Sequence, residues 1–241
     1  MSRYFIEVAY KGTGFSGFQV QENSITIQSE IEMAMQIFFR RPFMLTGSSR
    51  TDAGVHALQN YFHFDSDLPV PDESYRLNAL LPEDIVVKRI FAVNDEAHCR
   101  FDAISREYHY HLYSKKDPFK KDIAYYYPYT IDLELLNAAA KSILENHDFS
   151  AFAKRNSQAK TFECNMLCSE WVATEDGLKY IVKANRFLRG MVKGLVGTML
   201  QVGRGKLSIE QFRDIVESGD PSKADFAVPS QGLFLVRVEL Q

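Results

Sequence analysis

The sequence lacks long apolar runs, low-complexity stretches and all but a few cysteines. No apolar run approaches the ~20 residues that a membrane-spanning helix needs. The three cysteines, Cys99, Cys164 and Cys168, cannot all pair, and so few suit a reducing compartment. A strand-like pattern follows Met1 directly, so we expect no signal peptide. These absences favour a cytoplasmic globular protein.

The charges are almost balanced. There are 28 Lys and Arg residues against 31 Asp and Glu residues, which gives a formal net charge of −3. This balance excludes a protein that is basic all over. It leaves nucleic-acid binding open, because binding depends on a local basic patch rather than on the total charge. With 241 residues, 46% of them hydrophobic, the chain can bury a core without disulfide or metal staples.

The order of the expected elements repeats once along the chain. Each half approximates the split pattern β-α-β-β-α-β, which favours an α+β fold of two ferredoxin-like halves with antiparallel sheets. We place an N-terminal half at 1–103 and a C-terminal half at 104–241, and expect the catalytic site in a central cleft that the halves flank. The expected strands are 5–10, 43–45, 56–64, 85–93, 106–113, 166–173, 178–186 and 232–240; the expected helices are 26–40, 73–81, one after Thr130, 187–201 and one after Ser208.

Three of these helices carry signals for their first residues. Thr26 and Thr130 are of a residue type that caps helices. Ser208 and Gln211 have the spacing of a capping box. We therefore expect the helices to begin just after Thr26, Thr130 and Ser208.

The densest polar stretch is the loop Ser48-Ser49-Arg50-Thr51-Asp52-Ala53-Gly54-Val55-His56. One interpretation is an ordinary tight turn, in which Asp bonds its own backbone and Gly supplies a positive φ. A turn does not need a guanidinium two residues before the carboxylate, with a hydroxyl on each side of it. On a loop that faces a cleft, such a carboxylate can act as a nucleophile or a base.

The loop and several further segments resemble the tRNA pseudouridine synthase A family, in the family's order and nearly from end to end. The central segment Arg50–Ala57 is similar to the family's central motif. The other segments are Tyr10–Gln19, similar to Y-x-G-x-x-F-x-G-W-Q with Phe18 in place of Trp; Arg100-Phe101 followed by Ser105–Tyr110, similar to R-x-Y-x-Y; His147–Phe152; Phe187–Gly197, similar to F-L-x-x-M-V-R-x-x-V-G; and Pro229–Leu233, similar to A-P-x-x-G-L.

The resemblance implies an isomerase of tRNA processing that converts uridine to pseudouridine at positions 38, 39 and 40 of the anticodon stem-loop. It also implies a homodimer. The reaction oxidises nothing and neither adds nor removes a group, so we expect no cofactor and no metal. By resemblance Asp52 is the nucleophile, which leaves open whether it attacks ring C6 or sugar C1′.

The resemblance also implies roles for other residues. Tyr108 would stack on the extruded uracil and assist proton removal from C5. Lys193 stands where the family usually has Arg, and would pair with the catalytic carboxylate. Arg50 would help to hold the RNA with the target base flipped out. His56 stays outside the catalytic set, and Tyr110 is expected in the core.

Basic residues cluster in spite of the balanced total. Solvated loops are the ordinary interpretation of such clusters. In a tRNA enzyme they would contact phosphates. The candidates for RNA binding beside Arg50 are Lys154, Arg155, Arg186 and Arg189.

Two other functions remain as alternatives. One is a non-catalytic RNA-binding protein that keeps the fold. The other is an aspartate-dependent or metal-dependent hydrolase that uses Asp52 with His109 and His111. The spacing from Cys164 to Cys168 is not that of a zinc finger, and no fourth ligand pattern accompanies the two histidines.

Overall fold

A computed structural model describes residues 1–154 and 159–241 and divides the chain into two compact units. Unit 1 consists of Met1–Ile104 and Phe234–Gln241, and unit 2 of Ser105–Leu233. Both units combine helices with mainly antiparallel strands, so the α+β class is confirmed. No helix among the described residues is long and apolar enough to cross a membrane.

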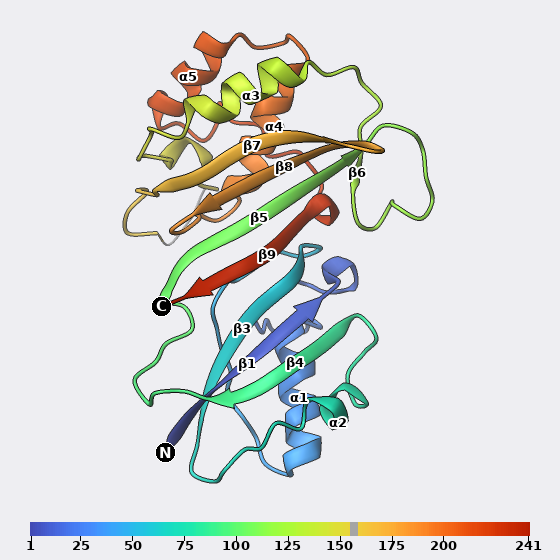
Figure 1. Cartoon of the computed structure of the whole chain (residues 1–241), viewed down its shortest axis with the longest axis vertical. Coiled ribbons are helices and arrows are strands. Elements are labelled where there is room, and N and C mark those ends of the chain that lie inside the picture. The colour runs from blue at the N-terminus through green and yellow to red at the C-terminus, as the bar shows by residue number, and fades with distance from the viewer. Residues whose placement is uncertain (155–158) are drawn as a thin grey trace. The chain divides into compact units, whose positions relative to one another are not determined.

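The sheet of unit 1 has the order β4-β1-β3-β9, and β2 pairs with the second half of β3. β1 is antiparallel to both β3 and β4. Helices α1 and α2 lie against this sheet (Figure 1). The elements of the unit are β1 (Ser2–Tyr10), the 3₁₀ turn η1 (Gly12–Gly14), α1 (Ile27–Phe39), β2 (Thr46–Gly47), β3 (His56–Ser66), α2 (Ser74–Asn78), β4 (Ile85–Ala92) and β9 (Leu233–Leu240).

The final strand departs from the expected division at residue 103. We assigned all of 104–241 to the second half, whereas Phe234–Gln241 belongs to unit 1. There β9 runs parallel to β3, with His56 opposite Phe234 and Ala57 opposite Leu235. A parallel neighbour is joined by a long crossover rather than a tight hairpin, so the local sequence pattern does not reveal its partner.

The core of unit 1 forms where α1 meets the sheet. Ile27, Ile31 and Met35 recur on one side of α1 and are buried. Thr26 caps the helix as predicted: its hydroxyl accepts a hydrogen bond from the backbone N–H of Ser29. The helix stripe therefore fixes which face of the sheet is covered.

The strand predicted near 43–45 lies just after those residues. The two-residue strand β2 at Thr46–Gly47 takes its place and pairs with His63 and Phe62. Phe43 is buried by ring packing, at 5.1 Å and edge-on to Phe64, rather than by strand pairing. An apolar pattern indicates that residues are buried, but it does not show whether they pair in a sheet. At Phe43 the packing of rings alone produces the burial.

Unit 2 carries the antiparallel sheet order β5-β8-β7, with β6 parallel to β5. Helices α3, α4 and α5 lie together on one side of this sheet (Figure 1). Beneath them Tyr110, Tyr180 and Val182 are fully buried. The elements are β5 (Ala103–Tyr113), β6 (Tyr125–Tyr126), α3 (Leu133–Ser142), η2 (Ser150–Phe152), β7 (Met166–Thr174), β8 (Gly177–Ala184), α4 (Met191–Gly203), α5 (Ile209–Ser218) and η3 (Ser230–Gly232).

Helix starts in unit 2 were predicted with mixed success. Ser208 and Gln211 form the expected capping box of α5. Helix α3 is capped by Asp132 rather than Thr130, because the Asp132 carboxylate accepts from the first free backbone N–H groups. Helix α4 begins at Met191 rather than 187, because Gly190 precedes it with a φ of +76°, outside the helical region.

Candidate active site

The loop that carries Asp52 joins β2 to β3 in unit 1. Its backbone is fixed at two carbonyls: Thr51 O accepts from Phe18 N at 3.1 Å, and Asp52 O accepts from Val55 N at 3.2 Å. The second bond closes a tight turn in which Gly54 has a φ of +79°. The turn interpretation is therefore correct for the backbone, and the side chain of Asp52 remains partly exposed.

A neighbouring segment packs closely on this loop. A Cβ atom on Gly12 would lie 2.0 Å from Val55 O, so no larger residue fits there without a backbone shift. The N–H of Gly12 donates to Nδ1 of His56 at 3.1 Å. The ring of His56 is buried and stacks on Phe234 with centroids 4.4 Å apart. His56 thus ties the loop to β9.

A buried polar network lies beneath the loop. The hydroxyl of Tyr10 lies 2.7 Å from Thr51 Oγ1. The amide of Asn60 donates to Tyr10 Oη at 3.1 Å and to Ser49 O at 2.8 Å. The sequence patterns did not identify Asn60, although Tyr10 and Thr51 lie within the matched motifs. Each side chain in this network is buried.

Arg50 points its guanidinium to the outside of the same loop. It is exposed, and its Nη1 donates to Gln19 Oε1 at 3.4 Å. Arg50 and Asp52 therefore share one loop in unit 1, with the anchored residue Thr51 between them.

The other predicted catalytic residues belong to unit 2. Tyr108 lies on β5, half-buried, and its ring meets Phe187 edge-on at 5.1 Å. Two residues further on, Tyr110 is a core residue as predicted, and its hydroxyl donates to Pro229 O at 2.7 Å. Burial raises the pKa of Tyr110 far above the ordinary value, so this tyrosine stays protonated.

Lys193 lies in the first turn of α4, half-buried. Its Nζ donates to Ser230 Oγ at 3.3 Å, in the turn η3 that precedes β9. The neighbours Met191, Val192 and Leu195 are buried, so most of the helix surface around the ammonium is apolar. A cation in such surroundings needs polar partners, of which Ser230 is one.

Of the predicted RNA contacts, the structure brings Lys154 and Arg189 together. Lys154 N donates to Arg189 O at 2.9 Å, and both side chains are exposed beside the start of α4. Arg186 bonds Thr161 Oγ1 through Nη1 at 2.9 Å. Arg155 lies outside the described residues.

One histidine of the pair His109 and His111 on β5 contacts a carboxylate of the same strand. Nε2 of His109 lies 2.8 Å from Glu107 Oε1, and the ring centroids of His109 and His111 are 6.1 Å apart. Within residues 1–154 and 159–241, no group of three or more His, Cys, Asp or Glu side chains could hold a metal ion. Burial raises the pKa of Cys164 to about 11, so this thiol is a poor nucleophile.

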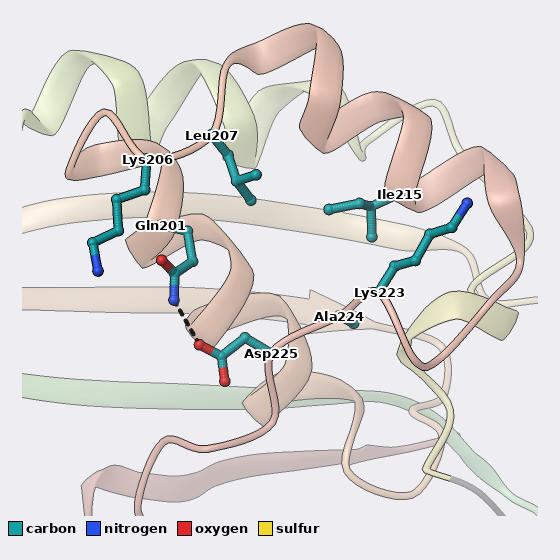
Figure 2. A pocket seen from close by; sticks show the side chains of 7 residues that line it. All are labelled: Gln201, Lys206, Leu207, Ile215, Lys223, Ala224 and Asp225. Carbon is teal, nitrogen blue, oxygen red and sulfur yellow. Dashed lines mark hydrogen bonds between the residues drawn. The ribbon is translucent and has the colours of Figure 1, made fainter.

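A pocket of about 420 Å³ lies in unit 2 between the end of α4, α5 and the segment before Asp225. Figure 2 shows that Gln201 reaches across it to Asp225, and the Nε2–Oδ2 distance is 2.8 Å. None of the predicted site residues lines this pocket. Its residues are Gln201, Lys206, Leu207, Ile215, Lys223, Ala224 and Asp225.

Comparison with known proteins places the chain among relatives of similar length. The model of the family described as tRNA pseudouridine synthase matches residues 139–240. A tRNA pseudouridine synthase A of Parabacteroides distasonis is 44% identical over 99% of this chain and 96% of its own length. Proteins of the same name from Porphyromonas gingivalis and Staphylococcus aureus are 42% and 37% identical over 99% of this chain and 97% and 91% of theirs. Because identity of this degree extends over nearly the whole chain, the protein belongs to the tRNA pseudouridine synthase A family.

Proposed function

We propose that this protein is an isomerase that converts uridine to pseudouridine in tRNA. The observation that carries the proposal is the part-exposed carboxylate of Asp52, on a fixed loop, in a chain with full-length relatives named for this activity. The reaction balances within the substrate. The N1–C1′ bond breaks, C5 bonds to C1′, C5 loses a proton and N1 gains one.

In this proposal Asp52 is the nucleophile. Covalent attack by a carboxylate divides one difficult step into two easier ones. Attack at ring C6 or at sugar C1′ leads to the same overall balance. The two backbone bonds at Thr51 and Asp52 support the role, because they hold the loop while leaving the side chain accessible.

Tyr108 and Lys193 are the proposed partners of Asp52 from unit 2. The half-buried ring of Tyr108 suits stacking on an extruded base, and its hydroxyl would help to take the proton from C5. Lys193 would supply the positive charge that pairs with the carboxylate. Its place in an apolar helix supports this role, because a half-buried cation in apolar surroundings is stabilised by an anionic partner.

We further propose that the substrate uridines are those at positions 38, 39 and 40 of the anticodon stem-loop, and that a homodimer acts in the cytoplasm. Arg50, Lys154, Arg155, Arg186 and Arg189 would contact the RNA. The two halves would be pseudo-repeats, which the element order β5-α3-β7-β8-α4-β9 supports through its likeness to β1-α1-β2-β3-α2-β4, once the additional elements β6 and α5 are set aside.

The replacement Asp52→Asn tests the proposal. It keeps size and polarity but removes the nucleophile, so we expect pseudouridine formation to stop while tRNA affinity stays within about tenfold, or about 1.4 kcal/mol. Carbodiimide-stop mapping of total tRNA, with and without the protein, measures both the product and its position. Asp67→Asn, an exposed aspartate outside the loop, is the matched control and should remain active.

Other outcomes would overturn the proposal or parts of it. A non-catalytic RNA-binding protein would bind tRNA without forming pseudouridine in the wild type. Substantial turnover by Asp52→Asn would remove Asp52 from its role. Product at positions other than 38, 39 and 40 would retain the activity but refute the proposed target.

A further inference from the structure

We infer that Asn60 is a positioning residue for Asp52, and that it acts through Tyr10 and Thr51 on the backbone of the catalytic loop. The inference rests on the proposed function, because it assigns a task to residues that surround the proposed nucleophile. Asn60 lies on β3 and is 0% exposed, so it acts through other residues rather than by touching the substrate.

The contacts of Asn60 fix the orientation of its amide. Oδ1 accepts from Tyr61 N at 2.9 Å and from Ser49 N at 3.3 Å. Nδ2 donates to Ser49 O at 2.8 Å and to Tyr10 Oη at 3.1 Å. A flipped amide would direct its NH₂ group at two N–H donors and its oxygen at a carbonyl, so only one orientation satisfies all four contacts.

This orientation determines the next link. The Tyr10 oxygen accepts a hydrogen bond from Asn60, so the tyrosine's own O–H is available to donate to Thr51 Oγ1 at 2.7 Å. Thr51 in turn directly precedes Asp52. The side-chain amide of Asn60 therefore holds the loop at two points. It bonds the backbone of Ser49 directly, and it acts on the side chain of Thr51 through Tyr10.

The serine side chains of the loop do not share this task. Among the described residues, Oγ of Ser48 and Oγ of Ser49 are buried without a hydrogen-bond partner. Buried hydroxyls without partners are costly, and neither one anchors the loop. Asn60 and Tyr10 therefore hold residues 48–51 through side-chain bonds, together with the backbone bonds of Ser48 N to Tyr61 O at 2.8 Å and of Phe18 N to Thr51 O.

Two other asparagines show what an ordinary backbone clamp looks like in this fold. Asn78 bonds both N and O of Val87, at 2.8 and 2.9 Å, and Asn137 does the same to Trp171 at 2.8 and 2.9 Å. Asn60 makes the same type of clamp on Ser49, but with its remaining amide capacity also used. Asn78 and Asn137 therefore provide controls of the same chemistry away from the loop.

The test compares variants of the network with matched variants elsewhere. Tyr10→Phe keeps the ring but removes the hydroxyl, and Asn60→Asp keeps the shape but replaces the donor NH₂ with oxygen. Tyr4→Phe is the control for the first variant, because Tyr4 lies on the same strand as Tyr10. Its buried hydroxyl also takes part in a hydrogen bond, which it accepts from Val70 N at 3.2 Å. Asn78→Asp is the control for the second.

We expect the network variants to lower kcat on tRNA by roughly 10- to 100-fold, because a misplacement of about 1 Å can cost about 10²-fold in rate. KM should change by less than about threefold, because binding of the tRNA does not use these groups. Thr51→Ser, which keeps the hydroxyl, should retain activity that Thr51→Val loses. Tyr4→Phe and Asn78→Asp should keep kcat within about twofold of the wild-type value.

The outcomes separate the inference from the proposed function. Activity in Asp52→Asn, or none in the wild type, would refute the function itself. If the function holds, the inference is overturned by wild-type kcat in Tyr10→Phe, by a change in KM alone, or by an equal loss of kcat in Tyr4→Phe. If Asn60→Asp fails to fold, Tyr10→Phe and the two Thr51 variants still decide.

Discussion

His63 should make the protein less stable as the pH falls below the ordinary pKa of histidine. This residue lies on β3 and is 6% exposed. Its Nδ1 lies 3.2 Å from Cys99 Sγ, and its ring contacts those of His98 at 4.4 Å and Phe5 at 6.2 Å. Protonation would place a charge among these groups, so the folded state resists it.

The structure gives the size of the effect. The pKa of His63 is lowered from 6.5 to about 4, first by burial and then by the charges of His98 and Arg3, while Asp65 and Asp102 act in the opposite direction. Well above pH 6.5 the histidine is neutral in both states, so its titration does not change the stability. As the pH falls from 6.5 towards 4, the unfolded chain binds a proton that the folded chain does not. At about pH 5 the linkage relation gives a loss of about 2 kcal/mol in the free energy of unfolding.

The replacement His63→Phe isolates this contribution. Phenylalanine keeps a ring in the site but does not titrate, so any packing cost is equal at both pH values. Urea unfolding measures the free energy of unfolding at about pH 7.5 and at about pH 5. The loss of this free energy between the two pH values should be about 2 kcal/mol smaller in His63→Phe than in the wild type. His147→Gln, which removes an exposed histidine, should keep the wild-type difference. If His63→Phe loses as much stability as the wild type on acidification, the reasoning is refuted.

Two further changes test packing and capping. A Cβ on Gly47 would lie 2.1 Å from Phe18 Cε1, so Gly47→Ala should cost about 1–3 kcal/mol in urea unfolding, whereas Gly14→Ala, with no atom within 4 Å, should cost far less. Ser208→Ala removes the side chain that accepts from Gln211 N, so thermal unfolding should show a loss of about 1 kcal/mol; an unchanged midpoint would contradict the role of the cap.

Local signals in the sequence predicted the parts of the fold that depend on neighbouring residues. The caps at Thr26 and Ser208 were correct because a cap is decided within four residues. The place of β9 beside β3 was missed because the pairing joins residues 56 and 234 across most of the chain. The apolar residues near Phe43 suggested a strand, whereas ring packing alone explains why Phe43 is buried.

The candidate site divides in the same way. The Asp52 loop was evident because its polar residues are consecutive. Asn60 was not, because the consecutive residues 60–64 of β3 are all buried, which removes the alternation that distinguishes an inward side chain from an outward one. Its partners come from residues 10, 49 and 61, and no pattern within a short window contains them.

A carboxylate that is to attack a substrate must remain accessible, so its loop cannot be held by apolar side chains packed on every side. The contacts that fix the loop's conformation must therefore lie on its buried side. Apolar contacts there would not define one conformation, because they are non-directional. Hydrogen bonds from Asn60 and Tyr10 supply the direction, and close packing at Gly12 restricts the backbone from the side. Glycine costs more conformational entropy on folding than other residues, and the satisfied buried bonds help to offset that cost. If Asp52 is the nucleophile, a loop built in this way reaches its reactive arrangement during folding, so that tRNA binding does not have to provide the free energy for ordering it.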